Sequence, residues 1–204
     1  MEFDEKEQKK IHRAVKFVTK AHDGQFRKES FLPYIVHPMA VLSMIAEWEI
    51  QDPTTRLAAL SHDVIEDCDV TQEQLAKVIG VKASEVVREL SFFPNSLSEI
   101  PANIQKQDYM RSFRESSVDA LVVKVADRCC NTYDFAVAGN KYAKKYWRKA
   151  SDLFSAMSSR RDEIVTHFGG PEKIDGRKNP QRELGEVIFT KMRYTRTCID
   201  GMVQ

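Results

Sequence analysis

Two histidines and two aspartates are the residues of this chain best suited to hold a metal ion: His37, His62, Asp63 and Asp127. His62 and Asp63 are adjacent, inside the string HDVIED, and Asp127 lies inside KVADR. Imidazole nitrogens and carboxylate oxygens suit a divalent transition-metal ion, and four such ligands leave coordination positions open for water and substrate. The sequence therefore predicts a single metal ion held by these four side chains.

The HDVIED string lies in a predicted helix over residues 52–67, with Asp52 as the N-cap and Pro53 at the first helical position. At about 100° per residue, one side of this helix carries one imidazole and three carboxylates, those of His62, Asp63, Glu66 and Asp67. Crowded carboxylates repel one another unless a cation compensates them. A solvated acidic face is the alternative interpretation of this pattern.

A second helix is predicted over residues 117–135, with a narrow polar sector on an otherwise apolar surface. The sector consists of Lys124, Asp127, Arg128 and Asn131. Polar groups on a buried helix must face either a salt-bridged interior or a wet pocket. A metal site with anionic ligands nearby accounts for all four side chains, whereas an internal salt bridge accounts for three.

His37 lies in the string PYIVHPMAV, at a predicted corner between a loop and a helix. Pro38 disfavours helical backbone at the residue before it and suits the first position of the helix that follows. A lone histidine at such a corner more often caps a helix or packs. Its assignment as a ligand therefore depends on the other three residues.

Three strings, in this order and at these separations, resemble the hydrolase domain of the RelA/SpoT-type alarmone enzymes: AHDGQFRKESFLPYIVHP, LSHDVIED and VVKVADRCCN. The best fit is to the small alarmone hydrolases, the stand-alone form within the HD-domain superfamily of metal-dependent phosphohydrolases. The resemblance runs over residues 11–168 and implies an all-α fold, a multi-helix HD-domain bundle. Apolar residues recur at helical spacing along most of the chain, which agrees with that fold.

The resemblance also implies a reaction, the removal of the 3′-pyrophosphate from guanosine tetra- or pentaphosphate to give GDP or GTP. The metal is commonly manganese, Mn2+, and Glu66 and Asp67 would handle the attacking water. The nucleotide pocket would be shaped by Arg27, Lys28, Tyr34 and Asn131. Lys124 and Arg128 lie beside Asp127 and are predicted to stabilise the leaving pyrophosphate.

Two departures from the family pattern lie near the presumed substrate. Ser30, Phe31 and Leu32 stand where Ser-Gly-Glu is usual, and Cys130 stands where a histidine or another polar residue is frequent. Two alternatives to the implied function therefore stay open. One is an HD phosphohydrolase of another nucleotide, or of a pyrophosphorylated RNA 3′ end in an antitoxin-like role against toxic relatives of the alarmone synthetases. The other is a non-catalytic sensor, although the intact HDVIED string argues against it.

Composition limits the partners of the protein. Its 204 residues include 31 basic and 30 acidic side chains, so no overall charge indicates nucleic acid or a membrane surface. No apolar stretch resembles a signal peptide or is long enough to span a bilayer, which predicts a cytoplasmic protein. The four cysteines show neither CxxC spacing nor a small disulfide framework. The oligomeric state is left open.

Two units are predicted along the chain: a phosphohydrolase domain over residues 1–168, and a polar linker with a last helix over residues 169–204 that packs on it. That helix could also mediate self-association or contact a partner. Residues 92–103 read as a loop, either a lid over the site or an ordinary connector. Thr71 and Gln74 form a predicted capping box. No run of residues predicts a sheet.

The segment KYAKKYWRK, residues 141–149, is the most basic part of the chain. Its cations and aromatic residues separate onto opposite halves of a helical wheel, which is typical of an amphipathic helix with a solvated basic face. Docking of a polyphosphate at the rim of the pocket and steering of a larger anion such as RNA are the alternatives.

Overall fold

The computed structural model describes residues 5–28, 31–138 and 140–203, and these form an all-α bundle, as predicted. The elements are, in chain order, α1 (Glu5–Ala21), α2 (Val36–Glu47), α3 (Pro53–Ser61), α4 (Val64–Asp67), α5 (Gln72–Ile79), α6 (Val81–Leu90), α7 (Ala102–Ser112), α8 (Val118–Ala138), α9 (Asn140–Arg148), α10 (Ser151–Ser159), α11 (Arg161–Gly169), β1 (Lys173–Ile174), β2 (Arg177–Lys178) and α12 (Arg182–Val203).

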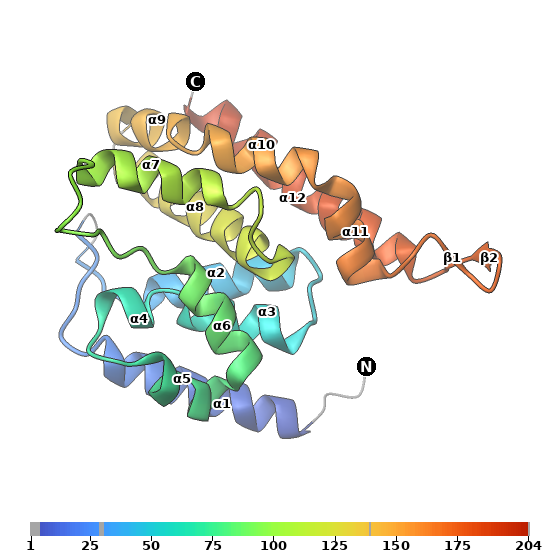
Figure 1. The fold of residues 1–204 in the computed structure, drawn as a ribbon, viewed down its shortest axis with the longest axis horizontal. Helices are drawn as coiled ribbons and strands as arrows, with labels where there is room; N and C mark the ends of the chain where they lie inside the picture. Colours follow the sequence, from blue (N-terminus) through green and yellow to red (C-terminus); the bar gives the residue numbers. More distant parts are fainter. Residues whose placement is uncertain (1–4, 29–30, 139, 204) are drawn as a thin grey trace.

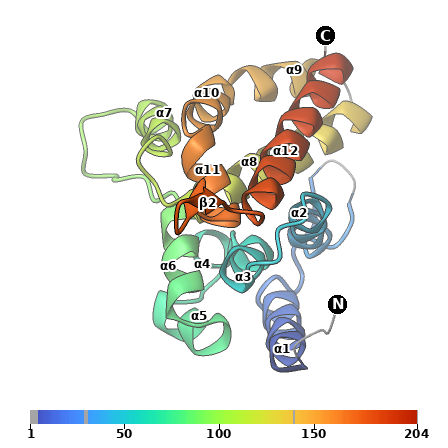
Figure 2. The ribbon, with the colours of Figure 1, turned by 90° about the vertical axis from the view of Figure 1, so that its right-hand side faces the viewer.

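Helix α8 is the central element of the bundle. It packs against α2, α3 and α6 on one side and against α9, α10 and α12 on the other. Figure 1 shows α1 and α5 at one end of the molecule and α9, α10 and α12 at the other, with α8 between them. Figure 2, turned by 90°, shows α12 crossing α8 on the side that faces away from α5 and α6.

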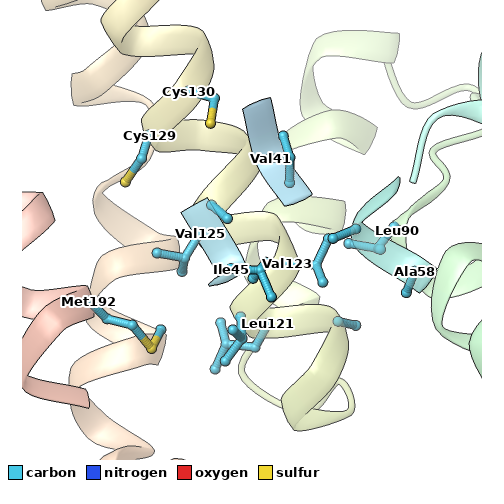
Figure 3. Packing of buried hydrophobic residues seen from close by; sticks show 14 of the residues in the cluster. Val41, Ile45, Ala58, Leu90, Leu121, Val123, Val125, Cys129, Cys130 and Met192 are labelled. Carbon is cyan, nitrogen blue, oxygen red and sulfur yellow. The ribbon is translucent and has the colours of Figure 1, made fainter. Parts of the chain in front are cut away.

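The composition of α8 explains its central position. Its residues from Ala120 to Cys130 are all buried, because apolar side chains surround the helix except in the predicted polar sector. Figure 3 shows Ile45 of α2 among Leu121 and Val125 of α8, with Met192 of α12 approaching from the other side. The core therefore holds α8 rigidly, and α8 carries Asp127.

The prediction of one continuous helix over residues 52–67 is wrong in one respect, because the helix is broken in the middle. Helix α3 ends at Ser61, and α4 begins only at Val64. Nδ1 of the His62 ring donates to the carbonyl oxygen of Ala59 at 2.8 Å and so takes an acceptor that a continuing helix would use. The predicted N-cap is confirmed, since Asp52 accepts a hydrogen bond from the backbone N–H of Thr55.

The start of α2 also differs from the prediction. The helix begins at Val36, two residues before Pro38, so that His37 lies inside its first turn. The missing N–H of Pro38 costs nothing there, because the first backbone N–H groups of a helix have no partner within it. His37 is therefore held by helical backbone and not by a loop.

Other local predictions are confirmed. Thr71 and Gln74 form the capping box of α5, which ends at Gly80 with φ +89°. Residues 91–101 form a loop, although α7 begins at Ala102, inside the range predicted as loop. In α9, Trp147 is buried while Arg148 is exposed, which fits an amphipathic helix.

The segment after α11 contains a short hairpin that the sequence pattern did not predict. Strands β1 and β2 pair antiparallel, with Lys173 opposite Lys178. Asp175 and Gly176 turn between them with positive φ, as this pair commonly does. Helix α12 then returns along α11 and contacts α8 and α9, and Trp48, the C-cap residue of α2, donates to Thr195 of α12 at 2.9 Å. None of the helices in the described ranges has the length and hydropathy to span a bilayer.

Candidate functional site

The structure brings the four predicted ligands together from three elements: α2, the turn between α3 and α4, and α8. One ligand atom each of His37, His62 and Asp63 lies within 4.8 Å of the other two. Nε2 of His62 is 3.2 Å from Nε2 of His37 and 2.9 Å from Oδ2 of Asp63. Oδ1 of Asp127 is 3.2 Å from Nε2 of His37 and 3.7 Å from Nε2 of His62.

The donor atoms of this cluster fit a divalent metal ion. Because the Ala59 carbonyl can only accept, Nδ1 of His62 keeps a proton, so loss of the second ring proton would leave Nε2 free to bind a metal ion in the cluster. Two imidazole nitrogens that face each other at 3.2 Å, between two carboxylates, are arranged as ligands of a shared cation. The mixed nitrogen and oxygen set suits several divalent metals and does not select one.

The charges in the cluster are strongly coupled. Burial disfavours the charged imidazolium of His62, but the neighbouring carboxylates outweigh it and raise its pKa to about 9. Burial would raise the pKa of Asp63 and Asp127, but the imidazoles and, for Asp127, the ammonium of Lys124 hold both pKa values below their usual range. Both carboxylates are therefore ionised at neutral pH, and a metal ion must displace the proton of His62.

The two carboxylates of the cluster, Asp63 and Asp127, line a cavity of about 170 Å³, whereas His37 and His62 are buried and are not among its lining residues. Eight of the residues predicted to act in the site line this cavity: Tyr34, Asp63, Glu66, Asp67, Lys124, Asp127, Arg128 and Asn131. The polar sector of α8 therefore faces a pocket that also receives the carboxylates of α4. An acidic surface in solvent and an isolated internal salt bridge, the alternatives considered above, do not describe this arrangement.

Five further lining residues are absent from the predicted set: Phe92, Lys106, Tyr109, Met110 and Tyr146. Lys106, Tyr109 and Met110 share a face of α7, at i, i+3 and i+4 spacing. Such spacing marks a helix face but does not show what it faces. Tyr146 belongs to the basic segment, so α9 borders the cavity.

Glu66 and Asp67 reach the cavity from the short helix α4. Oε2 of Glu66 accepts a hydrogen bond of 2.8 Å from the backbone N–H of Phe92, which orients the carboxylate. Burial raises the pKa of both carboxyl groups, and the charge of Asp63 adds to the effect. A carboxylate with a raised pKa is a better base, so either residue could accept a proton from water.

Tyr34 has its hydroxyl on the carboxylates of the site. The hydroxyl donates to Oδ2 of Asp63 at 2.6 Å and lies 3.2 Å from Oδ2 of Asp67. Its ring stacks on the ring of His22, with centroids 4.6 Å apart. Tyr34 was expected to shape the nucleotide pocket; in the structure it also orients a candidate metal ligand.

Arg27 and Lys28 lie outside the cavity wall. Nη2 of Arg27 donates to Oδ1 of Asn131 and to Oδ2 of Asp134, each at 2.8 Å. Nδ2 of Asn131 donates in turn to Oδ1 of Asp127, so one chain of contacts joins Arg27 to the cluster. Lys28 is exposed. Asp134 was not among the predicted site residues, although a residue seven positions beyond Asp127 lies on nearly the same side of α8 at about 100° per residue.

The departures from the family pattern lie on the surface and in the core. Phe31, with φ +57°, and Leu32 are exposed at the tip of the loop that carries Arg27. Cys130 is buried, and Ser30 lies outside the described residues. Cys130 lines a larger cavity of about 750 Å³ between α2, α8 and α12. That cavity is mainly apolar and lacks the histidine and aspartate cluster, so the smaller one is the candidate site.

Comparison with known proteins identifies the family. The family model described as HD domain matches residues 14–164. The chain belongs to the HD-domain family. The HD domain was predicted from the three strings around His37, Asp63 and Asp127, and that prediction is confirmed.

The relatives of this HD domain include larger proteins. It is 32% identical over 146 residues to guanosine-3′,5′-bis(diphosphate) 3′-pyrophosphohydrolase of Vibrio cholerae, covering 69% of this chain and 20% of the relative. It is 37% identical over 180 residues to the protein of the same name of Haemophilus influenzae, covering 85% and 24%. The chain thus spans between a fifth and a quarter of the length of these relatives.

A solved structure has the same fold. It is that of a metazoan ortholog of SpoT that hydrolyzes ppGpp, and it matches with a TM-score of 0.63. The match covers 89% of this chain and 94% of the other, at 23% sequence identity. The helical HD fold is therefore shared along most of both chains.

Proposed function

We propose that this HD domain hydrolyses guanosine 3′,5′-bis(diphosphate), ppGpp, with the help of a bound metal ion, and releases GDP and pyrophosphate. One observation carries the proposal: the two carboxylates of the candidate metal cluster, the basic carboxylates of α4 and the cations of α8 all line a single cavity. The names of the relatives from Vibrio cholerae and Haemophilus influenzae support this choice of substrate.

In this proposal His37, His62, Asp63 and Asp127 hold one metal ion, for which Mn2+ is the predicted species. When bound, the ion supplies a Lewis acid that activates water and neutralises phosphoryl oxygens. The Tyr34 hydroxyl fixes the orientation of Asp63. The His62 ring is fixed by the Ala59 carbonyl, which keeps Nε2 directed at the cluster.

The proton steps fall to the chain's own carboxylates. Glu66 accepts a proton from water as the water oxygen attacks the phosphorus attached to the 3′ oxygen of the nucleotide. The bond between that phosphorus and the 3′ oxygen breaks, and the 3′ oxygen takes up a proton. Asp67 shares the handling of water. Its carboxylate lies beside Tyr34 and therefore near Asp63.

The cations of α8 act on the phosphate groups. Nζ of Lys124 lies 3.2 Å from Oδ2 of Asp127, and despite its burial this carboxylate raises the pKa of Lys124 far above its usual range. Lys124 is therefore charged at every physiological pH. With Arg128, it would stabilise the negative charge that accumulates on the leaving pyrophosphate.

The boundaries and the location of the protein stay predictions. We propose that residues 1–168 form the catalytic domain. Residues 169–204, which include α12, support this domain where α12 contacts α8 and α11. The cytoplasm remains the predicted location, and the small alarmone hydrolases remain the predicted subgroup of the family.

Product analysis tests the proposal directly. Protein loaded with Mn2+ should convert ppGpp into GDP and pyrophosphate in equal amounts, as measured by anion-exchange chromatography. A metal-free sample treated with chelator is the control and should be inactive. Release of two single phosphates, or no turnover of ppGpp by metal-loaded protein, would contradict the proposed function.

A further inference from the structure

A hollow distinct from the candidate site lies between α2, α8 and α12, with a volume of about 750 Å³. Each of these helices lines it with residues at i, i+3 and i+4 spacing, beginning at Ala40, Cys130 and Lys191 respectively. Most of the lining side chains are apolar or aromatic, and those of Tyr133 and Tyr194 are exposed. Three helix faces therefore meet around one open apolar space.

Most charged groups of the hollow are paired within the chain. Asp134 accepts a hydrogen bond of 2.8 Å from Arg27, and Nζ of Lys191 lies 2.6 Å from Oε1 of Glu49. The carboxylate of Glu47 is on an exposed residue, where water can solvate it. The walls of the hollow therefore suit an apolar occupant better than an ion or a charged cofactor.

The loop before α2 projects apolar side chains beside this hollow. Phe31 is 80% exposed and Leu32 is 49% exposed. Backbone hydrogen bonds of 2.8 and 2.9 Å join Arg27 to these two residues and close the loop. Because Arg27 also contacts Asp134, the loop and the hollow adjoin, and Figure 2 shows the loop on the same side of the molecule as α2 and the end of α12.

The backbone of Phe31 adds to this picture. Its φ of +57° lies in the left-handed region, which glycine adopts freely and a bulky residue adopts at a cost. The exposed ring gains little from its own chain in return. Phe31 and Leu32 stand where Gly-Glu is usual in the family pattern, and Cys130 stands where a polar residue is frequent. Both departures from the pattern make this face more apolar, one in the loop and one in the hollow.

The exposed apolar area of the face matches the need of a stable dimer. Tyr133 is 54% exposed and Tyr194 is 70% exposed. At about 200 Å² for each aromatic side chain, these two rings and that of Phe31 expose roughly 400 Å². A standard interface takes roughly 800 Å² from each partner, of which about 60% is apolar. Four aliphatic side chains supply the remainder of that apolar share: Leu32, Val36, Met39 and Met202.

We propose that this face joins two copies of the chain, with Phe31 and Leu32 of each copy seated in the hollow of the other. Because the loop and the hollow lie on the same face, a two-fold axis forms both contacts at once. A helix of another protein is the less suitable occupant, since it would leave Phe31 and Leu32 in water. The inference goes beyond the proposed function and does not depend on it, because neither the loop tip nor the hollow lines the candidate cavity.

Sedimentation velocity over a series of concentrations tests the dimer. Phe31→Asp removes the apolar side chain, and aspartate tolerates the left-handed backbone of this position. Met202→Glu places a charge in the hollow on an exposed residue. The matched control is Ile174→Asp on the β1–β2 hairpin, which changes an apolar residue with the same exposure as Leu32, 49%. All four proteins should show the same helical content by circular dichroism.

Wild type should be dimeric, and Phe31→Asp and Met202→Glu should each raise the dissociation constant of the dimer at least roughly tenfold. The Ile174→Asp protein should match wild type. A wild type that stays monomeric at about 0.1 mM would overturn the proposal. So would a dimer that both variants leave intact, or one that the control weakens equally.

Cross-linking between copies identifies the occupant of the hollow. Cys198 is exposed and lines the hollow, so its thiol is available to a short bis-maleimide. Wild type is mixed with a Phe31→Cys/Cys198→Ser variant, and mass spectrometry should find position 31 of one copy linked to Cys198 of the other. Ile174→Cys/Cys198→Ser is the control and should give no such product. Equal yields from positions 31 and 174, or no product from position 31, would overturn the proposed contact.

Discussion

At the scale of single residues, neighbouring carboxylates of the cavity differ in their surroundings and therefore in their chemistry. Asp63 and Asp127 face imidazoles and an ammonium, which lower their pKa and keep them ionised as ligands. Glu66 is half-buried and Asp67 is exposed, and neither forms an ion pair among the described residues, so desolvation and the charge of Asp63 raise their pKa. Ligands and bases are thus distinguished by their partners and not by residue type.

The variant Glu66→Gln separates catalysis from metal binding. Its amide keeps the shape of the side chain and can still accept the hydrogen bond from the N–H of Phe92, but it cannot take a proton. Turnover should fall by roughly 10²- to 10⁴-fold, the usual contribution of general acid–base catalysis, while elemental analysis finds wild-type metal content. A near-normal rate would remove Glu66 from the mechanism.

Asp134 is predicted to position Arg27. The variant Asp134→Asn keeps the volume of the side chain but loses the charge that holds the guanidinium at 2.8 Å. We expect KM for ppGpp to rise roughly three- to tenfold, with kcat and metal content unchanged.

A double-mutant cycle is the control for this prediction. Because Asp134 would act through Arg27, the pair of substitutions Arg27→Ala and Asp134→Asn should raise KM no further than Arg27→Ala alone. The conservative variant Asp134→Glu should restore part of the wild-type KM. Additive effects of the two substitutions would show that Asp134 acts independently of Arg27.

At the scale of elements, the site depends on helices that are positioned by close contacts far from it. Helix α12 lies against α11 where Gly185 meets the backbone of Val165, and any Cβ at Gly185 would clash with the carbonyl of Val165. Helix α12 also contacts α8, which carries Asp127. The position of α8 is thus supported from the end of the chain.

The variant Gly185→Ala should force α11 and α12 apart. Overpacking of this kind costs about 1–3 kcal/mol of unfolding free energy, so thermal denaturation should occur at a lower temperature than in wild type. The control is Gly201→Ala on the same helix, where an added Cβ has no neighbour within 4 Å. That change should stabilise the protein slightly, by about 0.5–1 kcal/mol, because alanine favours a helix. Equal melting temperatures of both variants would contradict the close contact.

At the scale of the whole molecule, the cluster joins parts of the chain that are otherwise separate. His37 is on α2, His62 and Asp63 lie between α3 and α4, and Asp127 is on α8. A metal ion held by all four would cross-link these elements in the native state only. The binding free energy would therefore add to the stability of the fold.

Metal binding should consequently raise the melting temperature. At a hundredfold excess of Mn2+ over its dissociation constant, stabilisation is about 2.7 kcal/mol, or roughly 5–10 °C for a chain of this size. In Asp63→Ala the shift should disappear together with metal content and activity, although the protein still folds because the apolar side of α3 is intact. Wild-type metal content in that variant would remove Asp63 from the ligand set.

The sequence by itself determined the features that depend on residue type and on local geometry. The N-cap Asp52, the capping box of Thr71 and the polar sector of α8 follow from contacts within one helix. The four candidate ligands were found because two imidazoles and two carboxylates in three separate strings have few other uses in common. The same strings identified the HD family.

Tertiary structure decided what depends on contacts between distant segments. The break at His62 arises from competition for the Ala59 carbonyl, which a helical wheel does not represent. The pairing of Arg27 with Asp134 joins residues 107 positions apart, and the faces of α7 and α9 that complete the cavity are brought there by packing on α8. Periodicity shows that a helix has such a face. Only the packed core determines which neighbour that face meets, because burial energy depends on the whole set of contacts at once.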